Sequence, residues 1–169
     1  MAFTKKMQKA INEQLGYELG SSYLYLAMSA HFSHKNLAGA AHWFRIQAQE
    51  ELIHAMKLYD FILAREGEVS LQAVAAPGGN WKTSLVLFEE ALKHERMVSQ
   101  RFNDLAELAI KEKDHASANL LQWFVTEQVE EESQLVELIH KLKLIGDSGS
   151  GLFMLDQELG KRVLTTAAA

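Results

Sequence analysis

The chain has 169 residues, 48% of them hydrophobic, and a formal net charge of −5. This length is typical of one domain with a substantial core, so we expect a single domain over 1–169. The negative charge disfavours nucleic-acid coating, and the absence of cysteine excludes disulfides and thiolate metal sites. No stretch approaches the roughly 20 apolar residues that span a bilayer, and the N-terminus lacks the apolar core of a signal peptide. We therefore expect a cytoplasmic protein without a membrane segment.

Four long segments have apolar residues at three- and four-residue steps, which indicates helices. The predicted helices cover 4–33, 37–66, 82–111 and 114–144, and a shorter amphipathic one covers 152–162. Short turns near Lys35 and Lys113 join the first pair and the last pair, so each pair is expected to be antiparallel. The four long helices would form a bundle over about 4–144.

The segment from Gly67 to Trp81 contains Pro77, Gly78 and Gly79 and is predicted to be a loop. A 30-residue helix is about 45 Å long, and about fifteen extended residues reach about 50 Å. The loop can therefore cross the whole bundle and leave the second and third helices parallel. The predicted fold class is all-α: a four-helix bundle with one long crossover and a short fifth helix.

Each long helix carries polar residues where its buried stripe should be apolar. These are Glu18, Glu51 with His54 one turn later, Glu95, and the group Glu127, Gln128, Glu130 and Glu131. A buried carboxylate is costly unless something compensates it. Counted from the two turns, Glu18, Glu51, Glu95 and Glu130 lie about 16 to 18 residues away, so they share one height. This agreement predicts a shared metal centre.

Glu51 and His54 form Glu-x-x-His, whose side chains share one helix face. Carboxylate-bridged metal bundles take a Glu from each of two helices and Glu-x-x-His from each of the other two. Here the single glutamates are Glu18 and Glu95. Oxygen ligands with one imidazole suit iron, manganese or zinc. In the metal-free state, these clustered carboxylates should raise one another's pKa.

The last long helix departs from the symmetric pattern, because Gln128-x-x-Glu131 replaces a second Glu-x-x-His. The second ion should then be held more weakly, which favours metal turnover. Glu50, Glu127 and Glu130 could form a third, outer metal position. Tyr25 lies two turns after Glu18, where it either packs in the core or donates a hydrogen bond or an electron beside the metals.

These motifs resemble the ferritins, specifically the haem-free prokaryotic ones. The likeness is carried by residues 12–18, 21–25, 48–55 and 121–132. It implies the ferritin-like fold, a hollow cage of 24 subunits, and a fifth helix that meets symmetry mates at a fourfold channel. The helix-B methionine that binds haem in bacterioferritins is Leu52 here, so no haem is expected.

The resemblance also implies a role for each matching residue. Glu18, Glu51 and His54 would hold the first iron, and Glu51, Glu95 and Glu131 the second, with Glu51 bridging. Gln128 and Tyr25 would lie beside this di-iron centre, and Glu50, Glu127 and Glu130 would form the third site. The implied activity is that of a ferroxidase: Fe(II) is oxidised by O2 or H2O2, and Fe(III) mineral is stored in the cage.

Two other readings stay open at this point. A small di-iron redox enzyme, such as a rubrerythrin-like peroxidase, would hold similar ligands without storing mineral. The missing second Glu-x-x-His and the absence of a Cys-ligated module disfavour it. A DNA-protecting mini-ferritin would place its ligands between subunits, whereas this chain supplies a full set within one bundle and has no basic tail.

Overall fold

The computed structural model describes residues 3–165, so both ends of the predicted domain, 1–2 and 166–169, lie outside the described residues. Within that range the regular structure is helical. The helices are α1 (Lys5–His34), α2 (Ala38–Ala64), α3 (Ser84–Lys111), α4 (His115–Ile145) and α5 (Gly149–Leu159). The all-α prediction is confirmed.

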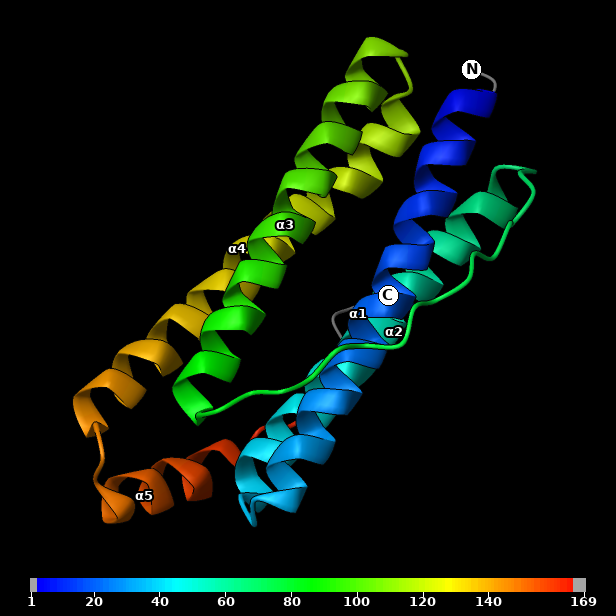
Figure 1. The fold of residues 1–169 in the computed structure, drawn as a ribbon. Coiled ribbons are helices and arrows are strands. Elements are labelled where there is room, and N and C mark those ends of the chain that lie inside the picture. Colours follow the sequence, from blue (N-terminus) through cyan, green and yellow to red (C-terminus); the bar gives the residue numbers. More distant parts are fainter. Residues whose placement is uncertain (1–2, 166–169) are drawn as a thin grey trace.

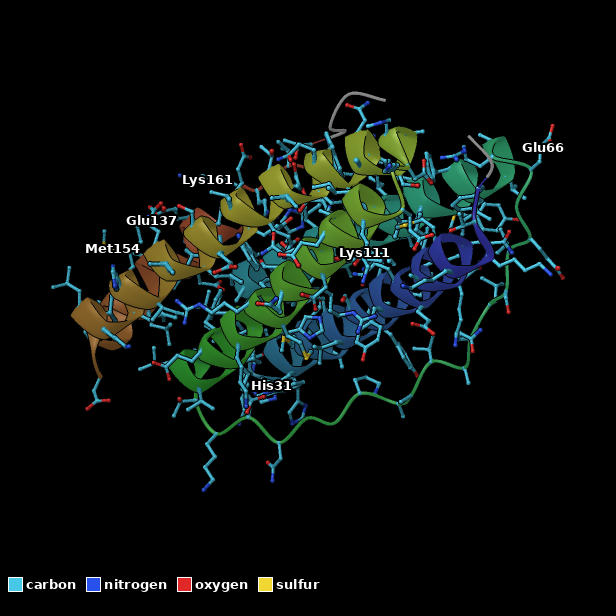
Figure 2. The ribbon with its side chains drawn as sticks, turned by 90° about the horizontal axis from the view of Figure 1, so that it is seen from above. His31, Glu66, Lys111, Glu137, Met154 and Lys161 are labelled. Atoms are coloured by element: carbon cyan, nitrogen blue, oxygen red, sulfur yellow. The ribbon has the colours of Figure 1, made fainter. Side chains whose placement is uncertain are left out.

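The four long helices form two antiparallel pairs, α1 with α2 and α3 with α4, as Figure 1 shows. The crossover from 65 to 83 runs along the outside of the bundle, so α2 and α3 are parallel. Asn12 fixes its beginning, because the Asn12 side chain donates to Glu68 O (3.0 Å) and accepts from Ser70 N (2.6 Å). Near its other end Trp81 packs edge-on against His31, which Figure 2 labels beside this segment.

The apolar core is divided into two clusters at opposite ends of the bundle. One cluster contains Phe32, Phe44 and Phe88 and continues onto α5. The other contains Ile11, Phe102 and Phe124. The polar interruptions of the helical stripes lie between them. The fold therefore provides a buried polar layer with apolar packing on both sides, which keeps water away from that layer.

The short helix α5 begins and ends about three residues earlier than predicted. The side chain of Ser148 accepts a hydrogen bond from Gly151 N (3.2 Å), which starts the helix inside the glycine-rich turn. Asp156 of α5 in turn accepts from Gly39 N (3.1 Å) and Ala40 N (2.8 Å). Because Leu37 gives α2 no side-chain cap, Asp156 supplies that cap from another element.

Asp114 joins three parts of the fold. It accepts from Ser117 N (3.2 Å) as the N-cap of α4, and from both terminal nitrogens of Arg65 (3.0 and 3.3 Å) at the end of α2. Burial would raise the pKa of Asp114, but the Arg65 guanidinium and Ser117 outweigh it and lower this pKa.

We expect Asp114→Ala to lower the free energy of unfolding by about 2 kcal/mol, because it removes a cap and leaves Arg65 unpaired. The native pKa is lowered, so the Asp114 contribution is complete above the ordinary carboxyl pKa and disappears as pH falls through the native value. Chemical denaturation at neutral and at strongly acidic pH measures both effects. Asp60→Ala, at an exposed position of α2, is the control. If Asp114→Ala lowered the free energy of unfolding no more than this control, the stabilising role of Asp114 would be contradicted.

Candidate metal centre

Side chains from all four long helices meet in the polar layer between the two apolar clusters. The sequence-predicted residues that are buried there are Glu18 and Tyr25 of α1, Glu51 and His54 of α2, Glu95 of α3, and Gln128 and Glu131 of α4. Each occupies a core-facing position of its helix. Such a layer is costly unless its charges are paired or bind a cation.

Glu18, Glu51 and His54 form the compact part of this layer. Each offers an atom that lies within 4.8 Å of the other two. His54 Nδ1 lies 3.7 Å from Glu18 Oε2 and 3.5 Å from Glu51 Oε2. Glu18 Oε2 and His54 Nδ1 are buried without a hydrogen-bond partner. Two orphaned ligand atoms that face each other fit a bound cation, which would compensate both.

Glu95 and Glu131 lie outside this compact group. Glu95 accepts hydrogen bonds from the Tyr25 hydroxyl and from Gln128 Nε2 (2.9 Å). Glu131 offers an oxygen to a second group, with His54 and the half-buried Glu127. Among the described residues, Glu51, Glu95 and Glu131 do not form one compact group of ligand atoms in this arrangement.

The three residues predicted for an outer position differ in their surroundings. Glu127 lies against the centre, through His54 and Glu131. Glu130 is exposed on α4. Glu50 is buried and pairs with Arg162, which follows α5. Glu50 is still close to the centre, since its charge contributes to raising the pKa of Glu131.

Three residues that sequence reasoning missed hold the ligands in place. Gln14 donates to Glu18 Oε1 (2.6 Å) and accepts from Arg101 Nε (2.9 Å). Gln47 donates to Glu51 Oε1 (3.2 Å) and to Glu131 Oε2 (2.7 Å). Each glutamine stands four residues before the glutamate on its own helix, a spacing that favours such pairs. That repeated spacing was a usable signal, whereas nothing in the sequence pointed to Arg101.

Burial and the neighbouring charges raise the pKa of three of the buried carboxyls. Burial, with a contribution from the charge of Glu51, raises the pKa of Glu18 to about 7 and that of Glu131 to about 8. Burial, followed by the charges of Glu51 and Glu131, raises the pKa of Glu95 well above its usual value. The expected repulsion within the cluster is therefore present, although burial is the larger cause.

Glu51 and His54 behave as an ion pair. Burial opposes ionisation of Glu51, but the neighbouring His54, together with Glu18 and His94, outweighs burial and holds the pKa of Glu51 below its usual value. Burial would lower the pKa of His54, but Glu18 and Glu51 raise it well above the ordinary value. Glu51 is thus the carboxylate that carries its charge most readily.

A four-helix bundle with one long crossover and a buried carboxylate–histidine cluster at its middle defines a metal-binding bundle of the ferritin-like class. Comparison with known proteins agrees. The family model described as a ferritin-like domain matches residues 8–145. The chain belongs to the ferritin family.

Individual relatives support this membership. The bacterial non-heme ferritin of Bacteroides fragilis is 41% identical over 94% of this chain and 99% of its own length. The bacterial non-heme ferritin of Escherichia coli O157:H7 is 40% identical over 91% of this chain and 93% of its own length. A solved open pore ferritin from the hyperthermophilic archaeon Archaeoglobus fulgidus superimposes with a TM-score of 0.94 at 44% identity, over 96% of this chain and 100% of that one. The protein is an iron-storage protein, and oxidation of iron is typical of its family.

None of the helices within residues 3–165 combines the length and apolar character needed to cross a membrane.

Proposed function

We propose that this chain is a ferroxidase with a di-iron centre inside each subunit. Glu18, Glu51 and His54 would bind the first iron, and Glu51, Glu95 and Glu131 the second, with Glu51 bridging the two. Fe(II) is the substrate, and O2 or H2O2 is the oxidant. The observation that carries the proposal is the pair of buried, unpartnered atoms, Glu18 Oε2 and His54 Nδ1, beside Glu51.

The surrounding residues suit this chemistry. Two adjacent iron ions can supply two electrons to one oxidant, and carboxylate oxygens stabilise the harder Fe(III) product. Gln14 and Gln47 hold one oxygen each of Glu18 and Glu51 and leave the other toward His54. The Tyr25 hydroxyl donates a hydrogen bond to Glu95. It would thereby orient a ligand of the second iron, and its phenol would be an electron donor beside the centre. Gln128 holds the other oxygen of Glu95.

The second ion would be the more mobile one. To reach it, Glu95 must turn away from Tyr25 and Gln128, and Glu131 must turn away from Gln47. At the centre α4 offers Gln128 in place of a second histidine. This supports turnover, in which oxidised iron leaves the centre for storage. Glu50, Glu127 and Glu130 would form a third iron site on the path by which this iron leaves the centre.

Storage of a mineral requires an enclosed space, and we propose assembly into a cage of 24 subunits in the cytoplasm. The outer side of α5 supports an assembly contact. Phe153 and Met154 are 64% and 71% exposed there, and Figure 2 shows Met154 pointing away from the bundle. Exposed large apolar residues on a short, docked helix are typical of a subunit interface.

The direct test of the site is an anaerobic calorimetric titration of the metal-free protein with Fe(II). We expect two tightly bound ions per chain, and loss of the tighter one in His54→Ala. Equal binding by the two proteins would contradict the assignment. An exposed histidine, His115 at the start of α4, offers the matched control His115→Ala.

The affinity for Fe(II) should rise with pH between about 6 and 8. Glu18 and Glu131 have pKa values raised to about 7 and about 8, so below these values both carboxyls keep protons that a cation must displace. Binding should therefore release protons, and fewer of them at higher pH. Calorimetry in buffers of different ionisation enthalpy counts these protons. An affinity that is constant over this pH range would contradict the expectation.

Glu130→Ala should change the stoichiometry of oxidation or the transfer of iron, and leave binding of the first ion within about threefold of wild type. Glu130 is exposed and lies outside the compact group, so its loss removes no ligand of that ion. Oxygen consumption per iron, measured together with anaerobic titration, separates the two effects. Unchanged stoichiometry with weakened first-ion binding would refute this division of roles.

A further inference from the structure

After α5 the chain turns back and lies against α2. We call residues 160–165 the C-terminal segment; it leads from α5 toward the α1–α2 pair (Figure 1). His42 Nε2 lies 2.8 Å from Arg162 O, and Arg162 Nη1 lies 3.4 Å from Trp43 O. The Arg162 guanidinium also lies over the Trp43 ring, 4.2 Å from its centroid. Backbone and side-chain contacts thus fix Arg162 on α2.

This placement directs Arg162 at Glu50. Its Nη2 pairs with Glu50 Oε2, and the Thr165 hydroxyl donates to Glu50 Oε1 (3.2 Å). Both side chains are largely buried, with 13% of Arg162 and 10% of Glu50 exposed. Both oxygens of Glu50 are therefore engaged by the C-terminal segment. Such a pair is screened less than a surface pair and is better fixed in geometry.

Glu50 is also a member of the proposed third iron site, directly before the bridging Glu51. A metal ion at that site needs a carboxylate oxygen as its ligand. A guanidinium donates hydrogen bonds and cannot ligate a cation. Arg162 and Thr165 hold both oxygens of Glu50 toward the C-terminal segment, and the guanidinium places a positive charge beside Oε2, so Arg162 and an incoming cation compete for this carboxylate.

We propose that Arg162 is a built-in competitor for the third iron site: it occupies Glu50 until an incoming cation displaces the C-terminal segment. This proposal rests on the proposed function, because it concerns a site next to the di-iron centre. It assigns a role in metal binding to a residue outside the four-helix bundle. The third ion is then the last to bind, and its binding is coupled to movement of the segment.

The test is a titration of the metal-free protein with Zn²⁺, which is not oxidised. Arg162→Met should leave the two tight ions unchanged and strengthen binding of the third by about tenfold, which corresponds to about 1.4 kcal/mol. Lys161→Met is the matched control, since it removes the same charge from the neighbouring residue, which is exposed and which Figure 2 labels. It should behave as wild type.

A second variant tests whether the effect of Arg162→Met comes from loss of the contact with Glu50 and not from a local distortion caused by methionine. A chain that ends at Leu159 keeps α5 and lacks Arg162 and Thr165, and it should show the same gain. If both variants bind the third Zn²⁺ no more tightly than wild type, or if Lys161→Met shows an equal gain, the proposal is wrong. Absence of the two tight ions from wild type would instead contradict the di-iron centre itself.

Discussion

Replacing Glu51 by alanine is expected to slow rapid Fe(II) oxidation by about a hundredfold or more, because both proposed iron positions share this carboxylate. Loss of residues that only orient metal ligands already costs about ten- to a hundredfold, and a bridging ligand should matter more. Stopped-flow absorbance after mixing the Fe(II)-loaded protein with O2 measures the rate of the first turnover.

The electrostatics of the site explain why no neighbour replaces Glu51. It is the carboxyl whose pKa is held below the usual value, whereas those of Glu18 and Glu131 are raised to about 7 and about 8. Its removal also takes away a partner of His54 and one acceptor of Gln47. The remaining carboxyls would bind cations only after losing protons at higher pH.

Glu13→Ala is the matched control for this experiment. Glu13 is exposed on α1 and makes a long surface ion pair with Lys9, so its loss should leave the oxidation rate unchanged. Both variants should elute at the wild-type size, which shows that assembly is intact. A wild-type rate in Glu51→Ala would overturn the assignment of the centre.

Replacing Gly39 by alanine is expected to displace α5 and to lower the free energy of unfolding by about 3 kcal/mol. A Cβ at Gly39 would lie 1.6 Å from the carbonyl oxygen of Asp156 and 2.6 Å from its carbonyl carbon. These are backbone atoms, so no side-chain rotation relieves the clash. Asp156 would then lose its hydrogen bonds to the start of α2. Thermal unfolding should show a decrease in Tm of about 10 °C.

Gly20→Ala should change the free energy of unfolding in the opposite direction. Gly20 also lies in a long helix, and a Cβ there meets nothing within 4 Å. Its replacement should stabilise the protein by about 0.5–1 kcal/mol through helix propensity alone. If Gly39→Ala were as stable as Gly20→Ala, close docking of α5 on α2 would be wrong. Because α5 carries the exposed Phe153 and Met154, its displacement should also reduce the size of the assembly in analytical ultracentrifugation.

The sequence predicts the buried layer well because a carboxylate in an apolar stripe is conspicuous. Glu18, Glu51, Glu95 and Glu131 stand at core positions of long, regular helices, where periodicity places each side chain without knowledge of the other helices. The turn positions also predict one height for the four helices, although the residue counted there on α4 was Glu130, which is exposed, and its neighbour Glu131 is the buried one. The helices that the structure describes follow this pattern closely, and the crossover length gives the parallel arrangement of α2 and α3.

Features that depend on contacts between elements were not predictable in this way. The start of α5 lies in a Gly-Ser-Gly stretch of low helix propensity, and the Ser148 cap and the docking of Asp156 on α2 offset this. The pairing of Arg162 with Glu50 joins residues 112 positions apart. Periodicity holds no information about such a pair. The orientation of Glu95 toward Tyr25 is likewise a property of the packed site.

We propose that each chain oxidises iron at its own buried centre and stores the product within an assembly. The most direct measurement loads the purified protein with excess Fe(II) in air and then determines particle size and iron content on the same sample. We expect a large, discrete assembly that holds far more iron per chain than the two or three ions of the proposed sites. A small oligomer that stops at about two ions per chain would contradict storage and favour a di-iron redox enzyme.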